Sequence, residues 1–140
     1  MYFPVYIQII LTVVLAFLDA LHDSSRIKKG ETIDHLPEMI IRGIILMIIT
    51  GFDPYMLMLC SAIFWILFEL ALNKMRGLDW LYVGKTALQD KFVRRIFGNN
   101  NPGLPFLIIK LIVLGALIYF RDEIYQIISF TLQYLSHVLE

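Results

Sequence analysis

The sequence predicts an all-α integral membrane protein with four transmembrane helices. Hydrophobic residues make up 59% of the 140-residue chain, a share that a soluble domain of this size rarely reaches. They gather into four long runs, and each run approaches the ~20 residues that a helix needs to cross ~30 Å of hydrocarbon. The predicted spans cover residues 4–21, 36–52, 55–72 and 104–121. The length fits one membrane domain, 1–140; a soluble bundle of very apolar helices is the alternative.

The first three predicted spans follow one another with short connections. Pro4 opens the first run and Pro37 the second, and proline suits a first helical turn because its missing N–H would have no partner there. The segment 51–54 ends in proline, which disfavours a helical conformation in the residue before it, so the chain reverses there. The third run carries Glu69 near its far end. A carboxylate is costly in lipid, so we expect it to face protein or water.

The segment 85–97 predicts an amphipathic helix at the membrane surface. Its apolar residues Leu88, Phe92 and Ile96 share one face. The basic residues that flank this stripe are Lys91, Arg94 and Arg95. Each contributes about 1 kcal/mol of attraction near an anionic leaflet, so we expect the helix to contact anionic lipid headgroups. The alternative is a helix that closes the bundle from below.

The fourth run and the carboxy-terminal segment are predicted to differ in character. Lys110 lies about a turn and a half inside the fourth run, and we expect its side chain to reach the membrane boundary. Residues 124–139 alternate apolar with polar side chains, which predicts an amphipathic helix. That helix either continues the fourth span with a bend or lies on the outer surface.

The basic residues predict the orientation. The loop after the first span holds three lysines and arginines, the loop after the third holds six, and the outer segments hold only Arg121. Short loops rich in lysine and arginine stay in the cytoplasm. Both termini should therefore lie outside. The net charge of zero gives no field for nucleic acid.

Three predicted helices carry polar residues at one membrane level, near the cytoplasmic boundary. At 1.5 Å per residue, Asp19 and Glu69 both lie roughly 22 Å from the outer face, and Arg42 reaches the same level from the inner side. On each predicted helix, residues three, four or seven positions apart lie on one face and add further polar side chains to it. The candidate metal ligands are Asp19, His22, Asp23, His35, Glu38 and Glu69.

The spacing of these groups points to a metal site. An acidic residue and a histidine three positions apart occur twice, a pairing that also holds metals inside helical bundles. Imidazole and carboxylate are ordinary ligands for zinc, iron or manganese. With Glu69, Arg42 and Lys85 as catalytic candidates, such a site could hydrolyse a phosphate or acyl ester of a lipid or nucleotide. The alternative is that these residues cap helices or pair with one another.

One part of the chain resembles a known pattern. It is carried by Phe64, Trp65, Phe68, Glu69, Leu72, Asn73, Arg76, Gly77, Trp80, Tyr82, Val83, Gly84, Lys85, Thr86 and Asp90, preceded by Asp19, His22, Asp23, His35, Glu38 and Arg42. This segment, 19–90, resembles small, uncharacterised membrane proteins encoded by bacteria and tailed phages. The resemblance implies no activity, and it suggests that the polar positions form one unit.

Three functions compete at this stage. The first is the metal-dependent hydrolase open to the cytoplasm. The second is a non-catalytic membrane protein, namely an oligomeric pore, a phage lysis or exclusion factor, or an accessory subunit. The third is a small carrier in which Glu69 and Arg42 move protons or ions, although the outer half of the predicted spans offers few polar residues for such a path.

Overall fold

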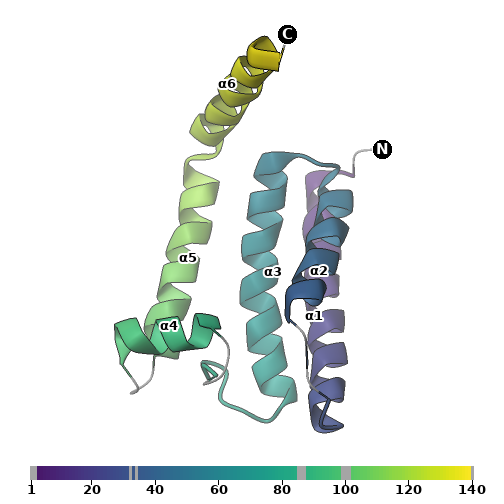
Figure 1. The fold of residues 1–140 in the computed structure, drawn as a ribbon, viewed down its shortest axis with the longest axis vertical. Coiled ribbons are helices and arrows are strands. Elements are labelled where there is room, and N and C mark those ends of the chain that lie inside the picture. Colours follow the sequence, from purple (N-terminus) through teal and green to yellow (C-terminus); the bar gives the residue numbers. More distant parts are fainter. Residues whose placement is uncertain (1–2, 32, 34, 85–87, 99–101, 140) are drawn as a thin grey trace.

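The computed structural model describes residues 3–31, 33, 35–84, 88–98 and 102–139. This part of the chain contains helices and no strand, which confirms the all-α prediction. The helices are α1 (Val5–Lys28), α2 (His35–Thr50), α3 (Pro54–Met75), α4 (Leu88–Phe97), α5 (Gly103–Tyr119) and α6 (Arg121–Leu139). In Figure 1, α1, α2, α3 and α5 run side by side, while the short helix α4 runs in a different direction near the end of the bundle where α5 begins.

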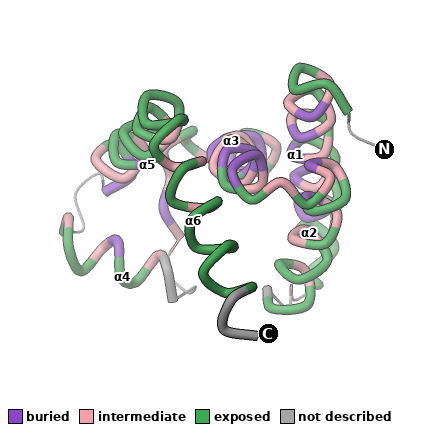
Figure 2. Tube along the Cα trace, turned by 90° about the horizontal axis from the view of Figure 1, so that it is seen from above, coloured by how far each residue is buried: buried purple, intermediate pink, exposed green. Residues whose placement is uncertain are grey.

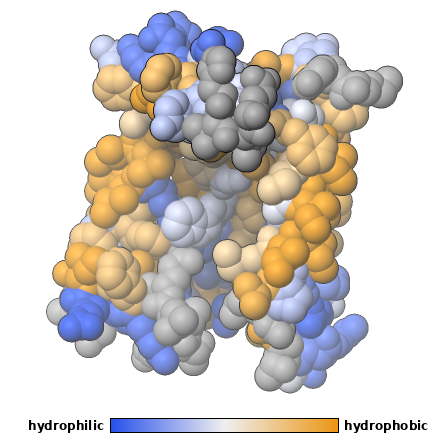
Figure 3. Space-filling model, turned by 45° about the horizontal axis from the view of Figure 1, so that its top comes forward, coloured by the Kyte–Doolittle hydropathy of each residue, from blue (hydrophilic) through white to orange (hydrophobic). Residues whose placement is uncertain are grey.

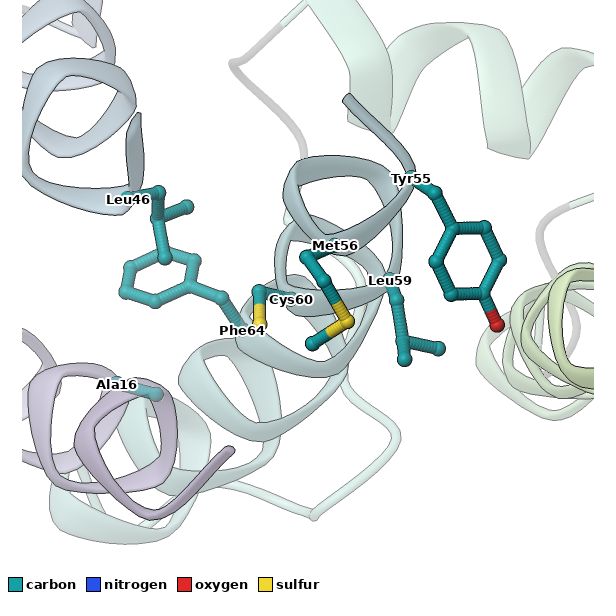
Figure 4. Close-up of a cluster of buried hydrophobic side chains, with 7 residues drawn as sticks. All are labelled: Ala16, Leu46, Tyr55, Met56, Leu59, Cys60 and Phe64. Carbon is teal, nitrogen blue, oxygen red and sulfur yellow. The ribbon is translucent and has the colours of Figure 1, made fainter. Parts of the chain in front are cut away.

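Helix α3 forms the centre of the bundle. It packs against α1, α2, α5 and α6, and Figure 2 shows it between the α1–α2 pair and α5. The core is small and lies mainly on α3, where Leu46 of α2 meets the Phe64 ring (Figure 4). The buried core residues are Ala16, Leu46, Tyr55, Met56, Leu59, Cys60 and Phe64.

Helix α1 approaches α3 through a row of small residues. Thr12, Ala16, Ala20 and Ser24 occur at every fourth position and are all buried, so they form one face of the helix. Small side chains let two helix backbones come close together, which is a common packing mode in membranes. The Thr12 hydroxyl donates to the Gln8 carbonyl at 2.8 Å, so it brings no unpaired polar group into the contact.

Two helices extend beyond the predicted spans, because their ends pack against neighbours. Helix α1 continues from the expected end at residue 21 to Lys28, where Gly30 adopts φ +79° and the Glu31 amide donates to the Arg26 carbonyl at 3.0 Å. This is the common way in which a glycine closes a helix. Helix α3 similarly continues to Met75 and ends before Gly77.

Judged by length and composition, fewer helices qualify as membrane spans than the four that the sequence predicts. Helices α1 and α3 are long and apolar enough to cross a membrane; α5 and α6 qualify only together, and a bend of 74° separates them. The described residues therefore contain two such helices, or three if the bent pair is one span. Helix α2 falls short because its 16 residues rise only about 24 Å. An apolar belt between two hydrophilic ends is visible in Figure 3.

The bend between α5 and α6 is attached to the turn that begins α3. The Tyr125 hydroxyl donates to Asp53 Oδ2 at 3.1 Å, and the Tyr55 hydroxyl donates to the Leu117 carbonyl at the same distance. The two tyrosine rings also pack with centroids 4.8 Å apart. Asp53 Oδ1 meanwhile accepts from the Met56 amide at 2.9 Å and caps α3. These contacts fix where α6 leaves the bundle, and α6 is a separate helix at a steep angle to α5.

Candidate functional site

Arg42 connects α2 to α1 through two carboxylates. Its Nε donates to Asp19 Oδ2 at 2.9 Å and its Nη2 to Asp23 Oδ2 at 2.7 Å. The guanidinium carbon also lies 4.5 Å from the centroid of the Phe68 ring of α3. The side chains of Arg42 and Asp23 are only 12% and 3% exposed. One planar cation of α2 thus contacts both α1 and α3, a geometry that suits arginine better than lysine.

Arg26 forms the second link between these helices. Its guanidinium donates to Glu38 at the start of α2 and to Glu31 in the connecting loop, the latter at 3.1 Å. Glu38 also lies in the first turn of α2, where the helix dipole favours an anion. The sequence argument placed Glu38 among the metal ligands, but in the structure it pairs with an arginine.

His22 stands apart from this network. Its side chain is 63% exposed, and its Nδ1 lies 3.7 Å from Asp23 Oδ1, which is too long for a hydrogen bond. Asp23 Oδ1 is buried and has no hydrogen-bond partner in the structure. The side chain of His35 and the whole of Lys85 lie outside the described residues, so their predicted roles stay predictions.

Glu69 pairs with Lys110 between α3 and α5. The Lys110 ammonium donates to Glu69 Oε2, and the lysine side chain is only 4% exposed. Its Nζ lies 4.4 Å from the ring centroid of Trp65 and 4.1 Å from that of Phe106. The expectation that Lys110 reaches the membrane boundary was therefore wrong. A carboxylate and two aromatic faces attract the ammonium inward.

Asn73 stabilises the loop that follows α3. Its Nδ2 donates to the carbonyls of Trp80 and Tyr82 at 3.1 and 2.8 Å. This loop passes against the start of α5, where a Cβ on Gly103 would lie 1.7 Å from the Leu81 carbonyl oxygen. Only glycine fits there. A small hollow beside Glu69 is lined by Asn73, Tyr82 and Gly103, among others.

The predicted metal ligands do not converge. Within the described ranges, no group of three or more histidine, cysteine, aspartate or glutamate side chains is placed to hold a metal ion. The physical reason is that each predicted carboxylate already contacts a cation of the chain. The catalytic candidates are also divided, because Arg42 lies between α1 and α2 while Glu69 faces α5.

The pairing partners were the part that sequence reasoning missed. Equal depth placed Asp19, Glu69 and Arg42 at one level, and of these Asp19 and Arg42 form a pair. Lys110 gave one usable signal: a lysine inside an apolar run at the level of a carboxylate on another run. The comparisons with known proteins add nothing to this assignment, since no family model, curated protein or solved structure matches the chain. Its resemblance to phage-encoded and bacterial membrane proteins therefore stays a prediction.

Proposed function

We propose that this chain is a non-catalytic integral membrane protein of the accessory-subunit type, in which buried charges join the helices. The observation that carries the proposal is that four carboxylates of the predicted site, Asp19, Asp23, Glu38 and Glu69, each pair with an arginine or lysine from another helix. A carboxylate held in this way is neither a free metal ligand nor an accessible base.

Four membrane spans are part of the proposal. Helix α2 is short, yet α1 ends and α3 begins at opposite ends of the bundle, as Figure 1 shows. The connection between them must cross the same distance, and α2 supplies most of it. Its charged start is neutralised by ion pairs to α1, which lowers the cost of placing a 16-residue helix in the membrane.

The orientation has both termini outside a bacterial inner membrane. Arg26, Lys28 and Lys29 lie at the end of the bundle where α1 and α3 finish, and Lys74 and Arg76 lie at the same end. The positive-inside rule then places that end in the cytoplasm. The turn between α2 and α3, which has no basic residue, faces outward.

The ion pairs support a structural role on energetic grounds. An unpaired charge near the centre of a spanning helix costs about 2.5–3.5 kcal/mol on insertion scales. Pairing with a cation on a neighbouring helix removes most of that cost and also selects which helices associate. Polar residues that contact each other inside one chain are also not available to line a pore between subunits, and this argues against the pore and the carrier.

A metal-dependent hydrolase acting on a lipid or nucleotide ester is the second candidate. One observation favours it: Asp23 Oδ1 is buried without a hydrogen-bond partner, beside the imidazole of His22. A divalent cation there would gain a carboxylate and an imidazole. It would also meet the Arg42 guanidinium that already contacts Asp19 and Asp23, and that repulsion in a medium of low dielectric ranks the candidate second.

Elemental analysis separates the two functions. The protein is purified without chelator or histidine tag, beside His22→Ala, Asp23→Asn and the control Glu31→Gln, whose carboxylate is 49% exposed. The accessory-subunit proposal expects zinc, iron and manganese far below one per chain in all four proteins. About one metal per chain in the parent and the control, lost in the other two, would overturn it in favour of the hydrolase.

A further inference from the structure

We propose that α4 is a docking helix for anionic lipid headgroups of the leaflet on its side of the membrane. The inference rests on the proposed membrane insertion of α1, α2, α3 and α5. The sequence predicted that Lys91, Arg94 and Arg95 contact the lipid. The structure leaves Lys91 and Arg95 for this contact, because Arg94 forms hydrogen bonds within the chain. The helix presents two different faces, one toward the protein and one away from it.

The inner face of α4 is fixed to the protein by a buried residue and an arginine. Val93 is 3% exposed. Next to it, Arg94 donates from Nε to the Gly84 carbonyl at 2.7 Å and from Nη2 to the Val83 carbonyl. These hydrogen bonds use the guanidinium on the chain itself, so Arg94 is a positioning residue and not a lipid contact.

The outer face of α4 combines apolar and basic side chains. Phe92 and Ile96 are four residues apart and are 64% and 55% exposed. Lys91 and Arg95 have the same spacing and are also exposed. Residues four apart lie above one another on a helix, so an apolar row runs beside a basic row. With Arg94 turned inward, the rows have a fixed direction relative to the bundle.

The position of α4 identifies the occupant of this face. In Figure 1, α4 lies near the end of the bundle where α3 finishes and α5 begins. At this end α3 finishes in Lys74 and Arg76, so the charged boundary of the proposed spans lies here. Two apolar side chains beside two cations match the boundary between acyl chains and anionic headgroups, where amphipathic helices bind. A cytosolic protein would have to reach the same face through the headgroups.

The test uses the full-length protein in vesicles. Cys60 is replaced by alanine, Ile96→Cys is labelled with an environment-sensitive fluorophore, and quenching by lipids that carry a nitroxide high on the acyl chain reports contact. Vesicles of neutral phosphatidylcholine are compared with vesicles that contain 30% phosphatidylglycerol. The variant Lys91→Gln/Arg95→Gln removes the basic row. The matched control, Lys28→Gln/Lys29→Gln, removes the same charge from exposed positions at the end of α1.

The proposal expects strong quenching in the anionic vesicles and weak quenching in the neutral ones. Each basic residue near an anionic leaflet contributes about 1 kcal/mol, and about 1.4 kcal/mol corresponds to a tenfold change in an equilibrium constant. The double variant should therefore lower the ratio of docked to undocked α4 roughly 30-fold, while the control retains it. Equal quenching in both lipids, or in the double variant and the parent, would overturn the proposal. Quenching that depends on the number of chains per vesicle would also overturn it, in favour of a second copy as the occupant.

Failure of this inference is distinguishable from failure of membrane insertion. An alkaline carbonate wash tests whether the spans are inserted in the vesicles, and it does not test the docking of α4. A chain that stays in the vesicles but shows no lipid-dependent quenching contradicts only the docking of α4. A chain that the wash releases contradicts the proposed four spans themselves.

Discussion

Replacing Lys110 by methionine should destabilise the protein by about 3 kcal/mol. The change leaves Glu69 without its cation, and breaking a buried ion pair costs about 3–5 kcal/mol. The lower end applies because the Glu69 side chain keeps 30% exposure while that of Lys110 keeps 4%. Methionine is the replacement of choice, since its sulfur still packs against the Trp65 and Phe106 rings.

A double variant turns this prediction into a test of the pairing itself. Glu69→Leu alone should also cost about 3 kcal/mol, because it leaves a buried ammonium without a carboxylate. The combination Lys110→Met/Glu69→Leu should restore most of the stability, since apolar residues of similar volume replace a buried pair at little cost. We expect a coupling free energy of at least about 2 kcal/mol between the two positions.

The free energy of unfolding can be measured by titration with sodium dodecyl sulfate in mild detergent micelles, with helix content as the signal. Leu111→Met, on the exposed face of the same helix, is the control and should stay within about 0.5 kcal/mol of the parent. If the double variant loses the sum of the two single losses to within about 0.5 kcal/mol, the two residues do not interact, and the assignment of the pair is wrong.

Three further changes test other parts of the molecule. Arg42→Gln should cost about 3 kcal/mol in the same titration, because two carboxylates of α1 lose their cation; a loss below about 1 kcal/mol would contradict the link. Asp53→Ala should lower the free energy of unfolding by about 1 kcal/mol, because α3 loses its cap, and it should speed amide hydrogen exchange in α6. Tyr125→Phe should speed that exchange but leave the cap in place. Cysteines at Lys29 and Phe52 test orientation in intact cells, with the parent as blank because its only cysteine is buried; position 52 should react with an impermeant thiol reagent, and labelling of position 29 would refute the topology.

Most of the helices could be predicted from the sequence because hydrophobic run length is a local property. The run beginning at Tyr55 and the run beginning at Leu104 both became helices close to their expected limits. The row at Thr12, Ala16 and Ala20 was equally local, and counting small residues at a spacing of four would have found the α1–α3 contact. The exact ends were harder, since α1 extends to Lys28 through packing that involves other helices.

The site could be predicted only up to the depth of its residues. Depth along a helix follows from residue number, so Asp19 and Arg42 were correctly placed at one level. Which groups touch depends on how each helix is rotated about its axis, and that rotation is decided by packing. Glu69 thus met Lys110, 41 positions away, rather than the histidines. A metal site needed several helices to face one point, whereas ion pairs needed only two at a time.

The row of small residues on α1 also constrains when this helix can pack during synthesis of the chain. Its partner is α3, and α3 is complete only when Met75 has been synthesised, 47 residues after Lys28. At 5–20 residues per second, that delay lasts roughly 2–10 seconds. During this interval the row of small residues on α1 is not yet covered by α3, although the Thr12 hydroxyl already donates to the Gln8 carbonyl within α1. The contact between α1 and α3 can therefore form only after 75 of the 140 residues have been synthesised.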